Sequence, residues 1–287
     1  MRPASRVAIG LLVLAVIGGA FLWGRRHAPP PAASPTPVAP PVAPVAPPPP
    51  PVKPAVLHPI AAASAPAALP ALDHSDDYLE KALDELVGPK SVLSFLIVDG
   101  LARRFVATVN NLATDGAAAD MWPVHRTAGR FDTEARVGGA VISGRNAERY
   151  AAFVRFVDGI DTRRAVALYV RLYPLLQHAY EELGFPGQYF NDRVVEVIDH
   201  LLATPDLAEP IKVKQVTVDG SARPSGAGLY VFDDPTLEAR SAGQKILLRI
   251  GVENARRLKS KLRDVRQRIA RGALPGGRLG ETVSRPR

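Results

Sequence analysis

The spacing of apolar residues predicts a folded domain built mainly from helices between residues 71 and 272. Apolar side chains recur three and four residues apart, which is the period of an α-helix. The segments that follow this period lie at 75–87, 92–98, 99–110, 146–157, 162–183 and 191–204. We therefore expect a mainly α fold.

The densest of these patterns, residues 169–205, predicts two helices joined by a tight corner. Residues 184–187 read Gly-Phe-Pro-Gly, a combination that ends one helix and turns the chain. Asn191 or Asp192 is placed to cap the second helix. So short a joint predicts an antiparallel helical hairpin, which we expect at the centre of the domain.

Two short segments have the period of a strand rather than that of a helix. Residues 211–218 (IKVKQVTV) alternate apolar with polar side chains, and residues 229–232 (LYVF) follow a Gly-rich turn. They predict one small β-hairpin. Residues 113–144 have no clear period, and we expect an irregular excursion there.

The last helical pattern, residues 242–271, predicts one long helix or two helices that meet at Gly251. Its apolar residues form one stripe, which we call the 255–269 seam, and the positions around the stripe are rich in Lys and Arg. The seam consists of Ala255, Leu258, Leu262, Val265 and Ile269. This 255–269 seam either packs on the chain's own domain or joins two copies in a homo-oligomer.

The chain before the domain has a different character. Residues 7–23 are apolar and uncharged, with Trp23 and two arginines at the end, and predict a membrane anchor within residues 1–28. A cleaved secretory signal is the alternative, but no A-x-A cleavage site follows soon. Residues 29–70 hold 17 prolines and predict a disordered linker. Proline motifs for SH3-like domains are the alternative there.

Charge and cysteine content narrow the function classes. The chain has no cysteine, which excludes disulfides, thiolate metal sites and cysteine nucleophiles. The net charge of +8 is concentrated at the end, because residues 240–287 hold 14 Lys/Arg and 3 Asp/Glu. We expect residues 273–287 to be a disordered basic tail. Nucleic acid is a less favoured partner than lipid, because residues 240–287 contain no aromatic side chain for base stacking.

Candidate functional side chains gather in residues 169–205. Glu196 and His200 are four residues apart on one helix, which suits either a metal or acid/base pair or an ordinary surface ion pair. The residues that we single out for binding are Tyr173, His178, Asn191, Glu196 and His200. No complete catalytic motif is present, so we assign no catalytic residue, no metal ligand and no cofactor.

Several blocks of the sequence resemble a known family. They read IVDGLARRFVATVNNL, MWPV, YPLLQHAYEELGFPGQYFNDRVVEVIDHLLATP and VFDDPTLEARSAGQKILLRIGVENARRLKSKLRDVR. These blocks are similar to the bacterial domain of unknown function 3014 family, over roughly residues 69–269. The resemblance implies an N-terminal membrane span and a Pro/Ala-rich linker before the domain, and it implies no activity, ligand or catalytic residue.

Together these observations favour a non-enzymatic binding or scaffold protein of the cell envelope. We expect a single-pass protein of the bacterial inner membrane with its C-terminal domain in the periplasm and an envelope protein or polymer as its partner. Two alternatives stay open. One is an envelope-acting enzyme that uses the cluster in residues 169–205, and the other is binding of anionic lipid or nucleic acid by the basic C-terminal helix.

Overall fold

The computed structural model describes residues 55–60, 69–116, 119–207, 210–216 and 229–270. The predicted membrane span, most of the predicted linker and the predicted tail at 273–287 lie outside these ranges. Within them, no helix combines the length and the apolar character that crossing a membrane requires.

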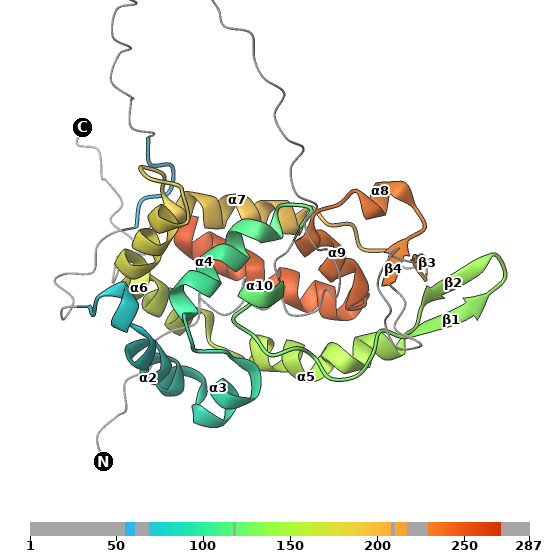
Figure 1. Cartoon of the computed structure of the whole chain (residues 1–287), viewed down its shortest axis with the longest axis horizontal. Coiled ribbons are helices and arrows are strands. Elements are labelled where there is room, and N and C mark those ends of the chain that lie inside the picture. The colour runs from blue at the N-terminus through green and yellow to red at the C-terminus, as the bar shows by residue number, and fades with distance from the viewer. Residues whose placement is uncertain (1–54, 61–68, 117–118, 208–209, 217–228, 271–287) are drawn as a thin grey trace, which may run out of the picture.

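Most of the described chain is helical, which confirms the predicted fold class (Figure 1). Short 3-10 turns occur at Leu72–His74 and Ala119–Met121. The α-helices are α2 (Asp76–Val87), α3 (Pro89–Phe95), α4 (Leu101–Leu112), α5 (Arg145–Gly159), α6 (Thr162–Glu182), α7 (Phe190–Leu202), α8 (Pro235–Glu238), α9 (Ala242–Arg249) and α10 (Val252–Ala270).

A small antiparallel sheet closes one end of the domain. Its strands are β1 (Thr133–Arg136), β2 (Gly139–Ile142), β3 (Lys212–Val216) and β4 (Leu229–Phe232), in the order β1-β2-β3-β4. The predicted hairpin is β3 and β4, which pair with Val213 opposite Phe232.

The prediction of a single hairpin is incomplete, because β1 and β2 form a second hairpin within the segment expected to be irregular. The absence of an alternating pattern in this segment has a physical reason. Strand β1 has two partly buried and two exposed residues and no buried one, so no buried face imposes an alternating apolar pattern. The two-residue turn at Val137 and Gly138 supplies the reversal, with Gly138 and Gly139 at φ angles of 85° and 130°.

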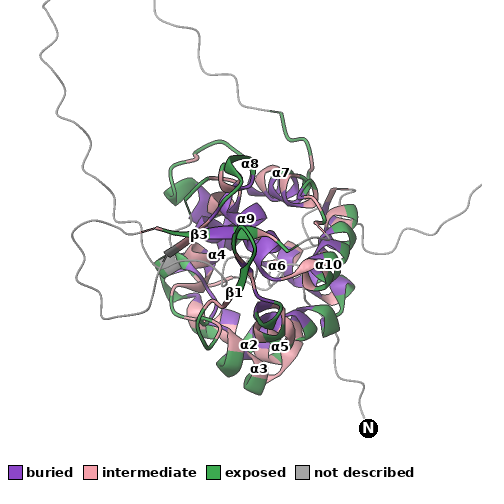
Figure 2. Cartoon of the chain, turned by 90° about the vertical axis from the view of Figure 1, so that its right-hand side faces the viewer, coloured by how far each residue is buried: buried purple, intermediate pink, exposed green. Residues whose placement is uncertain are grey.

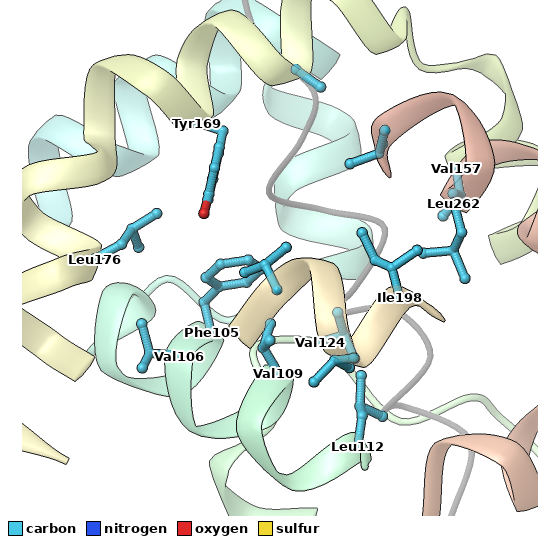
Figure 3. Close-up of a cluster of buried hydrophobic side chains, with 14 of the residues drawn as sticks. Phe105, Val106, Val109, Leu112, Val124, Val157, Tyr169, Leu176, Ile198 and Leu262 are labelled. Carbon is cyan, nitrogen blue, oxygen red and sulfur yellow. The ribbon is translucent and has the colours of Figure 1, made fainter. Parts of the chain in front are cut away.

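The predicted hairpin of α6 and α7 supplies much of the core. Tyr169, Leu172 and Leu176 from α6 and Phe190, Ile198 and Leu201 from α7 are among the most deeply buried side chains. Figure 3 shows Tyr169, Phe105 and Ile198 pointing into one cluster from three different helices.

The packing partners of the two helices differ from the prediction, however. Helix α6 lies mainly against α4 and α10, and α7 lies mainly against α10 and α4, so these two helices pass between the arms of the expected hairpin. Helices α6 and α7 meet directly along only a short part of their length. Their broad apolar stripes are filled by helices from both ends of the domain, because a stripe of that width needs more than one neighbour.

The C-terminal pattern divides at Gly251, as expected for two helices with a joint there. Gly251 has φ of 89°, and a side chain on it would lie 2.8 Å from Cβ of Ala147. The 255–269 seam is buried inside the domain, with each of its apolar residues at most 5% exposed. It packs against α5, α6 and α7, so the chain's own helices fill the face that the sequence offered to a second copy.

Candidate functional site

A short piece of the predicted linker is bound to the folded domain. We call residues 55–60 the linker strap; Figure 1 shows it beside the α6 and α7 end of the molecule. The backbone N–H groups of Leu57 and His58 donate to the carboxylate of Asp192 at 3.0 and 2.7 Å. The side-chain amide of Asn191 donates to the carbonyl of His58 at 2.7 Å. Ile60 packs against the edge of the core.

The first turn of α7 forms the floor of this contact. The sequence predicts Asn191 or Asp192 as a helix cap, but the helix begins earlier, after Tyr189, whose side chain makes no capping bond. Instead, the side-chain oxygen of Gln177 on α6 accepts from the N–H of Phe190 at 2.9 Å. The side chain of Gln177 thus satisfies one N–H of this turn, and the side chains of Asn191 and Asp192 bond to the strap.

Asn191 is the centre of a buried polar junction. It is 1% exposed, and its amide oxygen accepts from the hydroxyl of Tyr169 at 3.1 Å. Its amide nitrogen also lies 3.4 Å from the carbonyl of Ile269 near the end of α10. Burial raises the pKa of Tyr169 well above its usual range, which keeps the hydroxyl protonated as a donor. Asn191 thus joins the strap to the C-terminal end of the domain.

Tyr173 is the predicted site residue that lies next to this junction. Its ring meets that of Tyr169 edge to face, with centroids 6.0 Å apart, and its hydroxyl donates to the side-chain oxygen of Gln177 at 3.0 Å. Partial burial raises the pKa of Tyr173 to about 12. Tyr173 and Asn191 therefore both contact Tyr169 and lie at one junction.

The other three predicted residues lie in separate settings. His178 is exposed and pairs with Glu182 at 3.4 Å. Glu196 is exposed and pairs with Arg193 at 2.8 Å. Glu196 and His200 have different partners and make no pair with each other. In the described ranges no group of three or more His, Asp or Glu side chains is arranged to hold a metal ion.

His200 instead links two helices. Its Nε2 lies 2.8 Å from Oγ of Ser241, and that oxygen accepts from the N–H of Gln244 as the N-terminal cap of α9. The side chain of Gln244 donates back to the carbonyl of His200 at 2.9 Å. The serine is thus a cap, and the three side chains join the end of α7 to the start of α9.

Sequence reasoning missed Asp192 as a contact residue and missed the strap altogether. A signal was present. Between residues 29 and 68 only Leu57 and Ile60 are leucine or isoleucine, in a segment otherwise made mainly of Pro, Ala and Val. Of the two, Ile60 packs against the core, whereas Leu57 is 72% exposed and binds only through its backbone. The usable signal is therefore the isoleucine, because a large apolar side chain in a proline-rich linker indicates a segment that can pack against a domain.

Comparison with known proteins gives one match. A family model described as "Protein of unknown function (DUF3014)" matches residues 101–266, which is more than half of the chain. Among curated proteins and solved structures, none matches the chain. The matched region runs from the start of α4 through most of α10, and it includes Tyr169, Asn191 and Asp192.

Proposed function

This chain belongs to the DUF3014 family of unknown function, and on that premise we propose that its domain is a non-enzymatic module that binds a peptide segment at the start of α7. One observation carries the proposal. Asn191 and Asp192 hold the linker strap through its main chain, with two N–H groups on one carboxylate and one carbonyl on one amide.

This mode of recognition defines the ligand class. Two successive backbone N–H groups directed at one anion form a small concave binding element, here closed around Asp192. Neither residue that supplies these N–H groups can be proline, because proline has no N–H. The ligand is therefore a peptide with two successive non-proline residues followed by an accessible carbonyl, and the sequence at Leu57 and His58 meets this requirement.

The strap is the occupant supplied by the chain itself. We place the partner among cell-envelope proteins, with the chain anchored in the inner membrane through residues 7–23 and its domain in the periplasm. The apolar span and the proline-rich segment after it support this location. A reporter that is active only in the cytoplasm, fused after Arg287, should be inactive; activity would overturn the location.

The enzyme alternative has less support. It needs the polar groups of residues 169–205 to converge, whereas Glu196 is bonded to Arg193 and His200 to Ser241. For an anionic-lipid site on α10, two of its arginines are already engaged, because Arg256 pairs with Asp206 and Arg266 pairs with Asp199.

A competition experiment on the full chain tests the peptide site. The probe is a fluorescent peptide with the sequence of residues 53–62. Leu57→Pro removes one N–H from the strap in cis and should open the site. We expect this variant to bind the probe about tenfold more tightly than the unaltered chain, since a hydrogen bond to a charged group is lost from the competing strap.

Adding Asp192→Ala to the Leu57→Pro chain should abolish probe binding. Glu196→Ala, on an exposed carboxylate of the same helix that does not touch the strap, is the matched control and should leave binding unchanged. Equal binding with and without Asp192, or no binding by the Leu57→Pro chain, would overturn the proposal.

A further inference from the structure

The β1–β2 hairpin extends from the sheet end of the domain as an arm (Figure 1). Figure 2 views the molecule from that end and shows the tip of the arm as exposed. Residues 135–139 are exposed throughout, and Val137 at the turn is completely so, at 102%. Strand β1 is one edge of the four-stranded sheet, and β4 is the other.

The two edges differ in how their outward backbone groups are satisfied. On β4, Phe232 donates its N–H to the carboxylate of Glu238 at 2.9 Å, and the carbonyl of Tyr230 accepts from Arg249 at 2.9 Å. Side chains of the same chain therefore cover that edge. An edge that is covered in this way is protected from pairing with another strand.

On β1, the backbone N–H and C=O groups that point away from β2 belong to Thr133, Ala135 and Val137. This follows from the ladder: the N–H of Ser143 donates to the carbonyl of Asp132, and bonded positions then alternate along the strand. Within the part of the chain that the structure describes, no hydrogen bond reaches these outward N–H and C=O groups. Strand β1 is thus an open edge.

The charges on β1 are self-complementary. Glu134 and Arg136 flank Ala135 on the same face of the strand. If a second β1 pairs antiparallel with Ala135 opposite Ala135, each Glu134 lies opposite the other copy's Arg136. In the same register, the outward N–H and C=O groups of the two Ala135 residues face each other and form a hydrogen-bonded pair. Backbone hydrogen bonding and charge pairing are therefore satisfied by the same alignment of the two strands.

We propose that two copies of this chain pair through β1, with Ala135 on the twofold axis, to form a continuous eight-stranded antiparallel sheet. The occupant of the edge is a second copy because Glu-Ala-Arg about a central residue is complementary to itself when reversed. Within one chain, the carboxylate of Glu134 accepts from the hydroxyl of Ser143 at 2.8 Å and from Arg136 at 3.1 Å, which holds both charges on that face. This interface is separate from the peptide site, and either can fail without the other.

The absence of cysteine makes a direct test possible. In the proposed register the two Ala135 Cα atoms are about 5.5 Å apart, within the range of about 4.4–6.8 Å that a disulfide spans. The full chain with Ala135→Cys should therefore form a covalent dimer on mild oxidation. Val137→Cys is the matched control. In the proposed register, residue 137 of one chain lies opposite residue 133 of the other, and the two residues 137 are about 14 Å apart along the strands, so this variant should not crosslink.

Charge reversal in the Ala135→Cys chain tests the pairing itself. Arg136→Glu places two carboxylates opposite each other twice per dimer and should lower the yield of crosslinked dimer about tenfold. Adding Glu134→Arg should restore the yield, because each opposite pair is again of unlike charge. A yield at Ala135→Cys no greater than at Val137→Cys, or no rescue by the double reversal, would overturn the proposal.

Discussion

The hydroxyl of Tyr169 donates a hydrogen bond to the amide oxygen of Asn191 in the interior of the domain, at 3.1 Å. Tyr169→Phe would leave that oxygen buried without its donor, and we expect a loss of about 2 kcal/mol in the free energy of unfolding. Urea denaturation of the purified chain measures it. Tyr173→Phe is the control, because its acceptor Gln177 is only half buried and water can replace the hydroxyl. Equal losses in the two variants would contradict this account.

Asp192→Ala should release the strap without unfolding the domain. The carboxylate accepts from two strap N–H groups, and hydrogen bonds to a charged group are among the stronger ones. We expect the amides of Leu57 and His58 to exchange hydrogen much faster in the variant, while the amides of α7 keep their protection. Hydrogen exchange read by mass spectrometry gives both quantities; unchanged exchange at the strap would show that Asp192 does not hold it.

Asp206 should make stability depend on acidity. The ammonium of Lys259 donates to its carboxylate at 2.6 Å and holds the pKa of Asp206 below its usual range, with Arg256 adding to the effect. A lowered folded-state pKa means that the stabilisation is complete above the unfolded-state value of about 4 and is lost as the pH falls through the folded value.

Asp206→Asn should therefore cost about 1–2 kcal/mol at pH 7, and this difference from the unaltered chain should shrink below about pH 4. Denaturation series at several pH values give the comparison. A difference that stays constant from pH 7 to pH 3 would contradict the assigned pair.

Gly243 on α9 should be intolerant of any side chain. A Cβ there would lie 2.5 Å from a methyl group of Leu201 and 2.8 Å from the carbonyl oxygen of Leu112, and the backbone atom has little room to move. We expect Gly243→Ala to cost about 2–3 kcal/mol by overpacking, and to lower Tm by roughly 2–4 °C for each kcal/mol. Gly144→Ala, with nothing within 4 Å of its Cβ, should leave Tm nearly unchanged.

The helices could be predicted from the sequence because the period of apolar residues within one segment is enough to indicate a helix. The three- and four-residue spacing located α4, α5, α6 and α7, and the glycine at position 251 located the joint between α9 and α10. The arrangement of these helices was harder to predict. The broad stripe on α6 is compatible with several neighbours, and periodicity does not say that α4 and α10, far apart in sequence, will occupy it.

The candidate site shows the same division. Asn191 and Tyr173 were named from the sequence because polar and aromatic groups crowd there, and the structure brings both to one junction. For Asp192 the sequence predicts only a helix cap. Its role depends on Gln177 of the preceding helix satisfying the N–H of Phe190 and on a strap more than 130 residues earlier in the chain. No local pattern contains either fact.

The position of Asn191 between His58 and Ile269 has a mechanical consequence. The chain enters and leaves the described domain at a single corner, and the sheet lies at the far end of the long axis (Figure 1). Tension applied along the N-terminal segment would load the bonds of Asn191 and Asp192 before any core helix. Those few hydrogen bonds would then break first under force, while the body of the domain stays folded.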